Sequence, residues 1–210
     1  MSDWNTFLKT RAFPTIMDAG QYHGHGGEGI ILRTSKNECF KVFYGDMNSA
    51  KDLAEHEYTM LCTLFESEVH VPQPFKLTHF ELNKKNMPES IRVPRDLPLG
   101  GIFRYTLPEE LLYGIRPAIH RRFVIGQDAG PRIFSFHKKD ISNAVQDTNQ
   151  QIERAGYIFN DWKLPHNYII DMHGIAFAID CASVKLLTGS YEIGWSKKYV
   201  TPIMWHECIR

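Results

Sequence analysis

Apolar and polar positions alternate near the start of the chain and then change to a helical spacing. Residues 20–44 alternate and are rich in β-forming residues, which predicts a hairpin whose first connection lies at the glycines of the stretch GHGGEG. Residues 48–66 carry apolar side chains at helical spacing, and Asn48 or Ser49 is the expected N-cap of that helix.

The rest of the chain predicts short strands around one further helix. Two prolines interrupt VHVPQPFKL before a strand, residues 82–100 are polar and rich in Pro and Gly, and GGIFRYTL is a strand. A helix over DISNAVQDTNQQIERAG ends at Gly156, and NYIIDMHGIAFAID is a hairpin with its turn at Met172–Gly174. The order predicts an α+β fold of two lobes within one domain, with residues 1–108 in the first lobe and 109–210 in the second.

Composition and charge narrow the range of partners. Lys plus Arg and Asp plus Glu number 24 each, which argues against a dedicated nucleic-acid or polybasic membrane binder. The four cysteines form no C-x-x-C pair, which favours a reduced intracellular chain. The apolar runs are too short to span a bilayer, and the start has no cleavable secretory signal, so any export is expected to use an uncleaved route.

Three glycines with the spacing G-x-G-x-x-G are the first candidates for a ligand-binding site. Gly24, Gly26 and Gly29 fit either a loop that holds phosphates or an ordinary hairpin turn. A nucleotide site also needs a lysine for the phosphates, a glutamate to hold that lysine, and two oxygen ligands for magnesium.

The lysine and glutamate candidates follow in order. Lys41 stands among apolar residues in ECFKVF, where an outward-facing strand lysine is the alternative interpretation. Glu57 lies one helical turn before Leu61 on the same face, so it borders the buried side and needs a cation. Two alternatives to a Lys41–Glu57 pair remain: Glu57 is solvated, or Glu55 is the partner of Lys41.

The oxygen donors lie in the stretch FNDWKLPHNYIIDMHGIAFAIDCA. Asn167 and Asp180 carry the hard oxygen atoms that magnesium prefers, and Asp161 is placed to accept a hydrogen bond from an attacking hydroxyl. Taken singly, each is equally well explained as a turn residue.

This ordered set resembles the protein-kinase superfamily from Gly24 to about Ala182. GHGGEGII is similar to the glycine-rich loop, Lys41 and Glu57 to the strand lysine and helix glutamate, FNDWKLPHN to the catalytic loop, and Asp180-Cys-Ala to the D-F-G element. The resemblance implies ATP and Mg²⁺ as cofactors, with Asp161, Lys163, Lys41 and Glu57 in catalysis and Asn167 and Asp180 on the metal. It implies nucleotide contacts from Gly24, His25, Gly26, Gly27, Glu28, Gly29, Ile31 and Lys41, and from Arg104, Tyr105, Thr106 and Leu107 near the adenine.

The sequence departs from the kinase pattern at several positions, which indicates a shortened member of the superfamily. Phe159 replaces the loop histidine, Asn167 stands one residue farther from Asp161 than the pattern allows, and Cys181-Ala182 replaces Phe-Gly. No A-P-E element follows, so a truncated C-terminal lobe is expected. In size and pattern the chain resembles the minimal type III effector kinases of the HopBF family. That resemblance implies a secreted monomer that acts in the host cytoplasm and phosphorylates Ser or Thr of the ninety-kilodalton heat-shock chaperone.

Other functions on the same fold remain open. A small-molecule phosphotransferase or an AMP transferase would use the same ATP residues, and a pseudokinase that imitates a chaperone client would only bind. A metallohydrolase is disfavoured because no H-E-x-x-H occurs. Residues 82–100 are expected to form a hairpin or flap that recognises the protein target, since loops of this length are usually functional or mobile.

Overall fold

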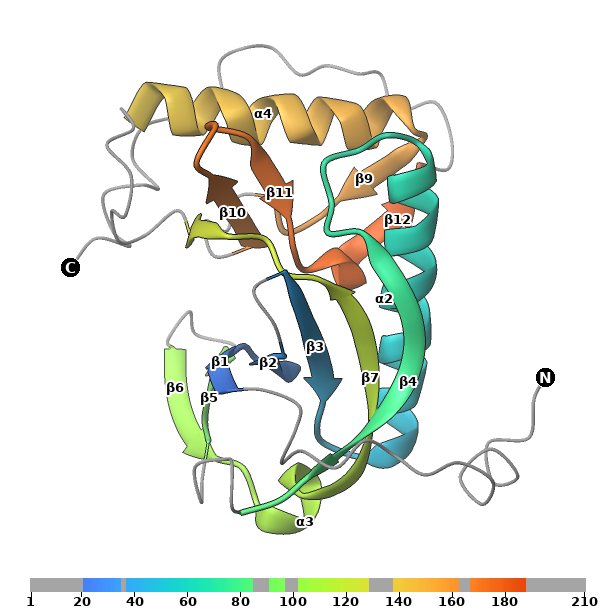
Figure 1. The fold of residues 1–210 in the computed structure, drawn as a ribbon, viewed down its shortest axis with the longest axis vertical. Helices are drawn as coiled ribbons and strands as arrows, with labels where there is room; N and C mark the ends of the chain where they lie inside the picture. Colours follow the sequence, from blue (N-terminus) through green and yellow to red (C-terminus); the bar gives the residue numbers. More distant parts are fainter. Residues whose placement is uncertain are drawn as a thin grey trace. The chain divides into compact units, whose positions relative to one another are not determined.

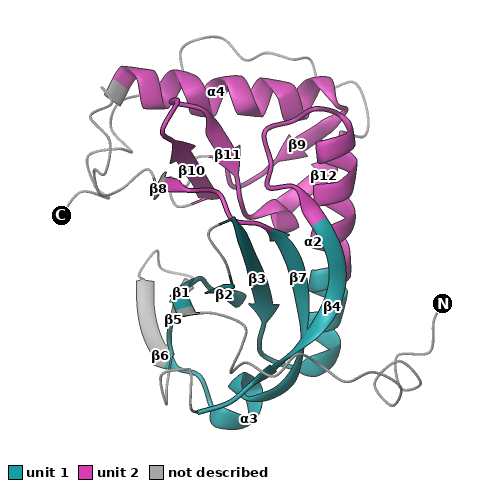
Figure 2. Cartoon of the chain, in the orientation of Figure 1, with its two compact units in different colours: residues 1–54, 75–121 teal, residues 55–74, 122–210 magenta. Residues whose placement is uncertain are grey.

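The computed structural model describes residues 21–34, 37–84, 91–96, 102–128, 138–162 and 167–187. The chain divides into two compact units (Figure 2). Unit 1 holds Met1–Ala54 and Phe75–Arg121, and unit 2 holds Glu55–Pro74 and Arg122–Arg210. The sequence places the division near residue 108, whereas the units separate after Arg121, because a further strand of the unit 1 sheet follows residue 108.

Unit 1 is built on a five-stranded sheet with the order β1-β2-β3-β7-β4 (Figure 1). Its strands are β1 (Gln21–His25), β2 (Gly29–Arg33), β3 (Glu38–Phe43), β7 (Gly114–Arg122) and β4 (Pro74–Leu82). The first three strands pair antiparallel in sequence, with Gly29 opposite Phe43 and Ile31 opposite Lys41. The hairpin predicted around the glycines is therefore present.

The core of unit 1 forms from the apolar positions that alternate along these strands. Strand residues point to opposite faces in turn, so the members of this core in β2 and β3 stand at alternate positions. The buried cluster consists of Ile30, Leu32, Phe40, Val42, Tyr44, Phe80, Leu82, Ile91, Leu107, Leu112 and Ala118. Phe40 and Phe80 have ring centroids 4.9 Å apart, so aromatic packing joins β3 to β4 at the centre of this core.

A separate two-stranded sheet is inserted between β4 and β7. It pairs β5 (Arg92–Asp96) antiparallel with β6 (Ile102–Thr106), and the short helix α3 (Glu109–Leu112) follows. The loop or hairpin predicted for residues 82–100 therefore contains the strand β5, which pairs with β6 in the predicted strand GGIFRYTL, while residues 85–90 and 97–101 lie outside the described part.

Unit 2 combines the helix α4 (Lys138–Arg154) with short strands. These are β8 (Gly126–Asp128), β9 (Tyr157–Phe159), β10 (Tyr168–Asp171), β11 (Ala176–Ala178) and β12 (Val184–Leu186). Val145, Thr148 and Ile152 of α4 are buried at the spacing of one helix face. Burying each of the two aliphatic side chains contributes about 1.5–3 kcal/mol, so this face fixes α4 within the unit.

The long helix α2 (Met47–Glu66) begins in unit 1 and ends in unit 2. Its N-cap is Asp46, whose Oδ1 accepts hydrogen bonds from the backbone N–H groups of Asn48 and Ser49, each 3.1 Å long. The sequence predicts Asn48 or Ser49 as the cap, and these residues instead supply the donors that a cap satisfies. At the other predicted helix end, Gly156 has φ +87°, which fits its role in ending α4.

The described elements make a mixed α and β fold with few helices. In the part of the chain that is described, no helix has the length and apolar character needed to cross a membrane.

Candidate functional site

The β10–β11 hairpin brings two predicted metal ligands to one of its ends. Tyr168 pairs with Ala178, and the next rung carries a hydrogen bond of 2.9 Å from the Ile179 N–H to the Asn167 carbonyl. Asn167 and Asp180 therefore flank the same end of the hairpin, although 12 residues lie between them in the sequence. The turn that closes the opposite end is held by the Oδ1 of Asp171, which accepts from the N–H groups of His173 and Ile175 at 2.9 Å each.

Helix α4 anchors both strands of this hairpin. The Tyr168 hydroxyl donates to Asn149 at 2.7 Å, and the Thr148 hydroxyl donates to the Ala176 carbonyl at 2.7 Å. Burial raises the pKa of Tyr168 above its usual range, so its hydroxyl remains a proton donor at every physiological pH. The hairpin end that carries Asn167 and Asp180 is thus held rigidly within unit 2.

The third residue of the predicted set, Asp161, is joined to Asn167. The Nδ2 of Asn167 donates to the Asp161 backbone carbonyl at 3.1 Å, and the Asn167 side chain is buried. Because the amide nitrogen is engaged in this bond, the Asn167 oxygen is the atom that can be offered to a cation. Asp161 itself is exposed, in the turn that follows β9. Asp161, Asn167 and Asp180 are therefore brought together by the local structure of unit 2.

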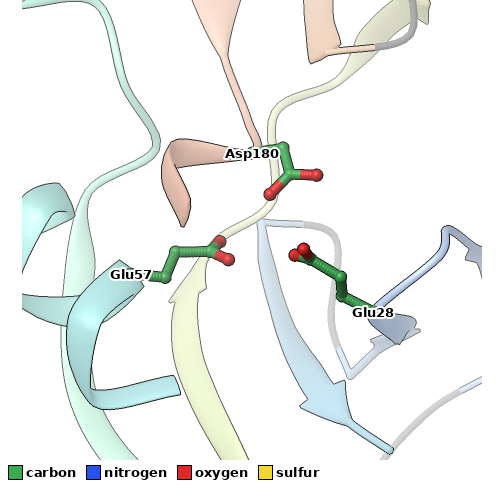
Figure 3. Close-up of side chains that lie close together, drawn as sticks. All are labelled: Glu28, Glu57 and Asp180. Carbon is green, nitrogen blue, oxygen red and sulfur yellow. The ribbon is translucent and has the colours of Figure 1, made fainter. Parts of the chain in front are cut away.

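Glu57 adds a second carboxylate to this end of unit 2. Its ligand oxygen and that of Asp180 lie within 4.8 Å of each other, as Figure 3 shows, and Glu57 is fully buried. Two carboxylates at this distance repel one another unless a cation lies close to both. The donor set of Glu57, Asp180 and Asn167 consists of hard oxygen atoms, so it fits a magnesium ion as well as a lysine ammonium. Glu28, also drawn in Figure 3, belongs to unit 1.

In unit 1, the glycines form the turn between β1 and β2. The Gly26 N–H donates to the Gly29 carbonyl at 2.9 Å, which closes a tight turn. A Cβ on Gly29 would lie 2.6 Å from the Val42 carbonyl oxygen, so glycine is required where β2 packs against β3. A Cβ on Gly24, Gly26 or Gly27 would meet no atom within 4 Å, so an incoming group can approach this backbone.

Lys41 is buried in β3, which excludes the outward-facing alternative for this lysine. Its Nζ lies 5.1 Å from the centroid of the Phe43 ring on the same strand face. A cation above an aromatic face recovers part of its lost hydration, but a buried ammonium also needs negative charge. Lys41 and Glu57 belong to different units, so their pairing stays a prediction.

The residues that depart from the kinase pattern pack into the interior of unit 2. Phe159 is buried, with its ring centroid 5.7 Å from that of Tyr168, so it supports the hairpin by apolar contact. Cys181 is fully buried in a short 3-10 helix, Cys181–Ser183, directly after Asp180.

The other residues predicted for the site lie in different parts of the chain, and one of them is not described by the structure. Lys163 lies outside the described residues. Arg104, Tyr105 and Thr106 belong to β6, which pairs with β5 and not with the five-stranded sheet, and Leu107 is buried in the unit 1 core. Ile31 lies in β2 opposite Lys41, and His25 ends β1 beside the glycine turn.

Sequence reasoning missed the residues that hold the glycine turn in place. Tyr44, at the end of β3, donates its hydroxyl to the Gly26 carbonyl and its N–H to the Glu28 carbonyl at 3.2 Å. Only the position of Tyr44, three residues after Lys41 in a hairpin that folds back on the glycines, could have indicated this role.

Comparisons with known proteins add little to this site. No protein-family model matches the chain, and no curated protein matches it. A similar solved structure is a co-crystal structure of WbdD with the kinase inhibitor LY294002, with a TM-score of 0.48 and 13% identity. The match covers 78% of this chain and 32% of WbdD, so this chain spans about a third of that protein's length. A likeness at this TM-score assigns neither fold nor function by itself.

Proposed function

We propose that this protein is a magnesium-dependent phosphotransferase that uses ATP, and in its finer assignment a Ser/Thr protein kinase. The observation that carries the proposal is the Asp161–Asn167–Asp180 arrangement in unit 2. There, one hydrogen bond joins the first two residues and the end of the β10–β11 hairpin joins the last two. The open glycine turn and the buried Lys41 of unit 1 support it.

The chemistry of phosphoryl transfer assigns a role to each group. Magnesium, when bound, neutralises charge on the transferred phosphoryl group. Asp180 and Asn167 would hold that ion, and Asp161 orients the acceptor hydroxyl and receives its proton. Lys163, two residues after Asp161, adds positive charge beside the transferred group. Catalysis here is mainly positioning and electrostatic stabilisation.

In unit 1, the backbone of the glycine turn and Lys41 would hold the ATP phosphates. Backbone N–H groups of a glycine turn bind phosphate oxygens because no side chain keeps the ligand away. The proposed adenine contacts are Arg104–Leu107 or, as a second candidate, residues 123–125, which directly follow β7 and belong to unit 2.

The proposed substrate is a protein. Only the resemblance to HopBF kinases supports a host chaperone of the ninety-kilodalton heat-shock class as the target, together with secretion by a type III route. The β5–β6 hairpin, inserted between two strands of the unit 1 sheet, is the proposed recognition element for that target.

Isotope-labelled ATP separates the candidate reactions. The purified chain is incubated with eukaryotic cell extract and magnesium, using γ-labelled ATP in one reaction and α-labelled ATP in the other. We expect only the γ label to enter a protein, and acid hydrolysis to release phosphoserine or phosphothreonine. Transfer of the α label would instead identify an AMP transferase, and ATP binding without transfer of either label would identify a pseudokinase.

A matched pair of variants tests the site itself. Asp180→Asn keeps the size of the side chain but removes the charge that holds magnesium, so transfer should fall by about a thousandfold or more. Asp171→Asn makes the same change in the turn at the other end of the hairpin, where Oδ1 can still accept both backbone hydrogen bonds. It should keep transfer within about twofold. Near-parental transfer by Asp180→Asn would contradict the assignment of Asp180 as a metal ligand.

A further inference from the structure

Tyr44 contacts the glycine turn of unit 1 with two groups. Its hydroxyl donates to the Gly26 carbonyl, and its backbone N–H donates to the Glu28 carbonyl at 3.2 Å. The two acceptors are the first and third residues of the turn that the bond from the Gly26 N–H to the Gly29 carbonyl closes. One residue therefore fixes both the entry and the tip of this turn.

Tyr44 itself is held in a rigid position. Its ring belongs to the buried core cluster of unit 1, with a relative exposure of 6%. The next residue, Gly45, is bonded on both sides: its N–H donates to the Leu111 carbonyl at 2.8 Å, and its carbonyl accepts from Arg116 Nη1 at 2.9 Å. Arg116 also donates through Nη2 to the Glu110 carbonyl. This buried guanidinium thus ties the segment that follows β3 to α3.

The turn has a second attachment through His25. The Nδ1 of His25 is hydrogen-bonded to the Tyr22 hydroxyl, and Nε2 lies 3.0 Å from the Arg92 carbonyl of β5. When Nδ1 accepts from Tyr22, Nε2 carries the proton and donates to Arg92. The residue before the turn is therefore bonded to the inserted hairpin, while the turn itself rests on Tyr44.

We infer that Tyr44 is a positioning residue for the glycine turn, which it holds in the conformation that receives the phosphates of ATP. The inference rests on the proposed function. The backbone of Gly24, Gly26 and Gly27 is open to an approaching group, and glycine chains lose much conformational entropy when they are ordered. When Tyr44 already fixes the turn, the conformational entropy is lost during folding and not during binding. The turn therefore binds the ligand with higher affinity.

The variant Tyr44→Phe removes the hydroxyl and leaves the ring in the core. Tyr113→Phe is the matched control, because it removes a hydroxyl from a residue that packs against the same core cluster but lies outside the turn. Two measurements are made on each full-length variant: amide hydrogen exchange of residues 24–29 without nucleotide, and the dissociation constant for ATP with magnesium by calorimetry.

A hydrogen bond of typical net strength corresponds to about a fivefold change in an equilibrium constant. We expect Tyr44→Phe to speed exchange in residues 24–29 by about fivefold and to weaken ATP binding by a similar factor, with both unchanged in Tyr113→Phe. Unchanged exchange in Tyr44→Phe would show that the Tyr44 hydroxyl does not hold the glycine turn. Faster exchange with unchanged ATP affinity would overturn the positioning role. A parent chain that does not bind ATP would overturn the proposed function and the positioning role together. Faster exchange in Tyr44→Phe would then show only that the Tyr44 hydroxyl holds the glycine turn.

Discussion

At the residue scale, burial sets Lys41 apart from an ordinary strand lysine. A lysine in a strand is normally exposed at its ammonium, whereas Lys41 is 6% exposed and lies over the Phe43 ring. Burial of an ammonium costs free energy that packing does not return. A buried strand lysine is therefore a candidate for a functional role, which stays a prediction for Lys41.

Lys41→Met should separate stability from activity. Methionine keeps the length of the stem, whereas alanine would leave a void in the strand face, so we expect the chain to stay folded and to unfold cooperatively on heating, as the parent does. Phosphoryl transfer should fall by about a hundredfold or more, because a fixed charge at the phosphates is lost. The control is Lys76→Met, which changes an exposed lysine of β4 and should leave transfer unchanged. Parental transfer by Lys41→Met, measured with γ-labelled ATP, would remove Lys41 from the mechanism.

The candidate site was predictable where chemistry fixes the residue type. Magnesium requires oxygen donors and phosphates require glycine or a cation, so Asn167, Asp180 and Lys41 stand out against their neighbours in the sequence. Tyr44 does not stand out, because an aromatic residue at the end of a strand is ordinary core composition. Its hydroxyl acquires a role only when β3 folds back beside the glycine turn, and no local pattern records that contact.

At the element scale, the N-terminus of α2 makes a pH-dependent contribution to stability. The backbone N–H of Ser49, followed by that of Asn48 and the Ser49 hydroxyl, lowers the pKa of the Asp46 carboxyl by hydrogen bonding to its charged form. A folded-state pKa below the unfolded-state value, about 3.9, means that this contribution is complete above that value. It is lost as the pH falls through the folded-state pKa.

Asp46→Asn should remove this acid sensitivity while keeping a cap acceptor. Asparagine caps helices about as well as aspartate, so the Tm at pH 7 should change by only a few degrees. Between pH 5 and pH 2.5, the Tm of the parent should fall more steeply than that of Asp46→Asn, as followed by circular dichroism at 222 nm. Asp52→Asn, an exposed position on the same helix, is the control and should follow the parent curve. Parallel curves for parent and Asp46→Asn would show that the cap bond does not depend on charge.

Most of the longer elements were predictable, whereas α3, β7, β8 and β12 were not, and the failure at β7 has a physical cause. The strands with alternating apolar residues and the helices with a clear 3.6-residue period are present as predicted. Strand β7 was missed because its sequence, GIRPAIHRR, contains Pro117, a residue that lacks the N–H needed in a sheet ladder and argues against a central strand. Here β7 lies between β3 and β4, with Arg116 and Arg121 both buried, so the usual alternation is hidden.

At the scale of the whole molecule, that missed strand also moved the predicted division of the chain. With β7 read as part of the second lobe, the division falls near residue 108, whereas unit 1 extends to Arg121. The inserted β5–β6 hairpin contributes to this difference, because it places a strand pair of its own between β4 and β7 in the sequence. Long-range strand order depends on pairing partners far apart in the sequence, and periodicity does not contain that information.

At this scale, the last prediction concerns the proposed role of the β5–β6 hairpin in recognising a protein target. Its strands pair only with each other among the described residues, and the bond from His25 to the Arg92 carbonyl ties β5 to the end of β1. Removing the whole hairpin would disturb the glycine turn as well as any surface for a partner. A sharper change leaves both strands and replaces only residues 97–101, LPLGG, which connect Asp96 to its pairing partner Ile102.

Replacing LPLGG with SGSGG keeps the length of this connection and removes its leucines and proline. We expect ATP affinity and ATP hydrolysis to stay within about twofold of the parent, since His25 keeps its partner on β5. Phosphorylation of the protein target found with γ-labelled ATP should fall by about tenfold or more, because apolar anchors carry much of the affinity of a protein interface. Met172→Ser, which removes a side chain that is 65% exposed in unit 2, is the control for losing an exposed apolar group. If the SGSGG variant phosphorylates the target at the parental rate, recognition lies elsewhere in the chain, and residues 183–210 are the next segment to replace.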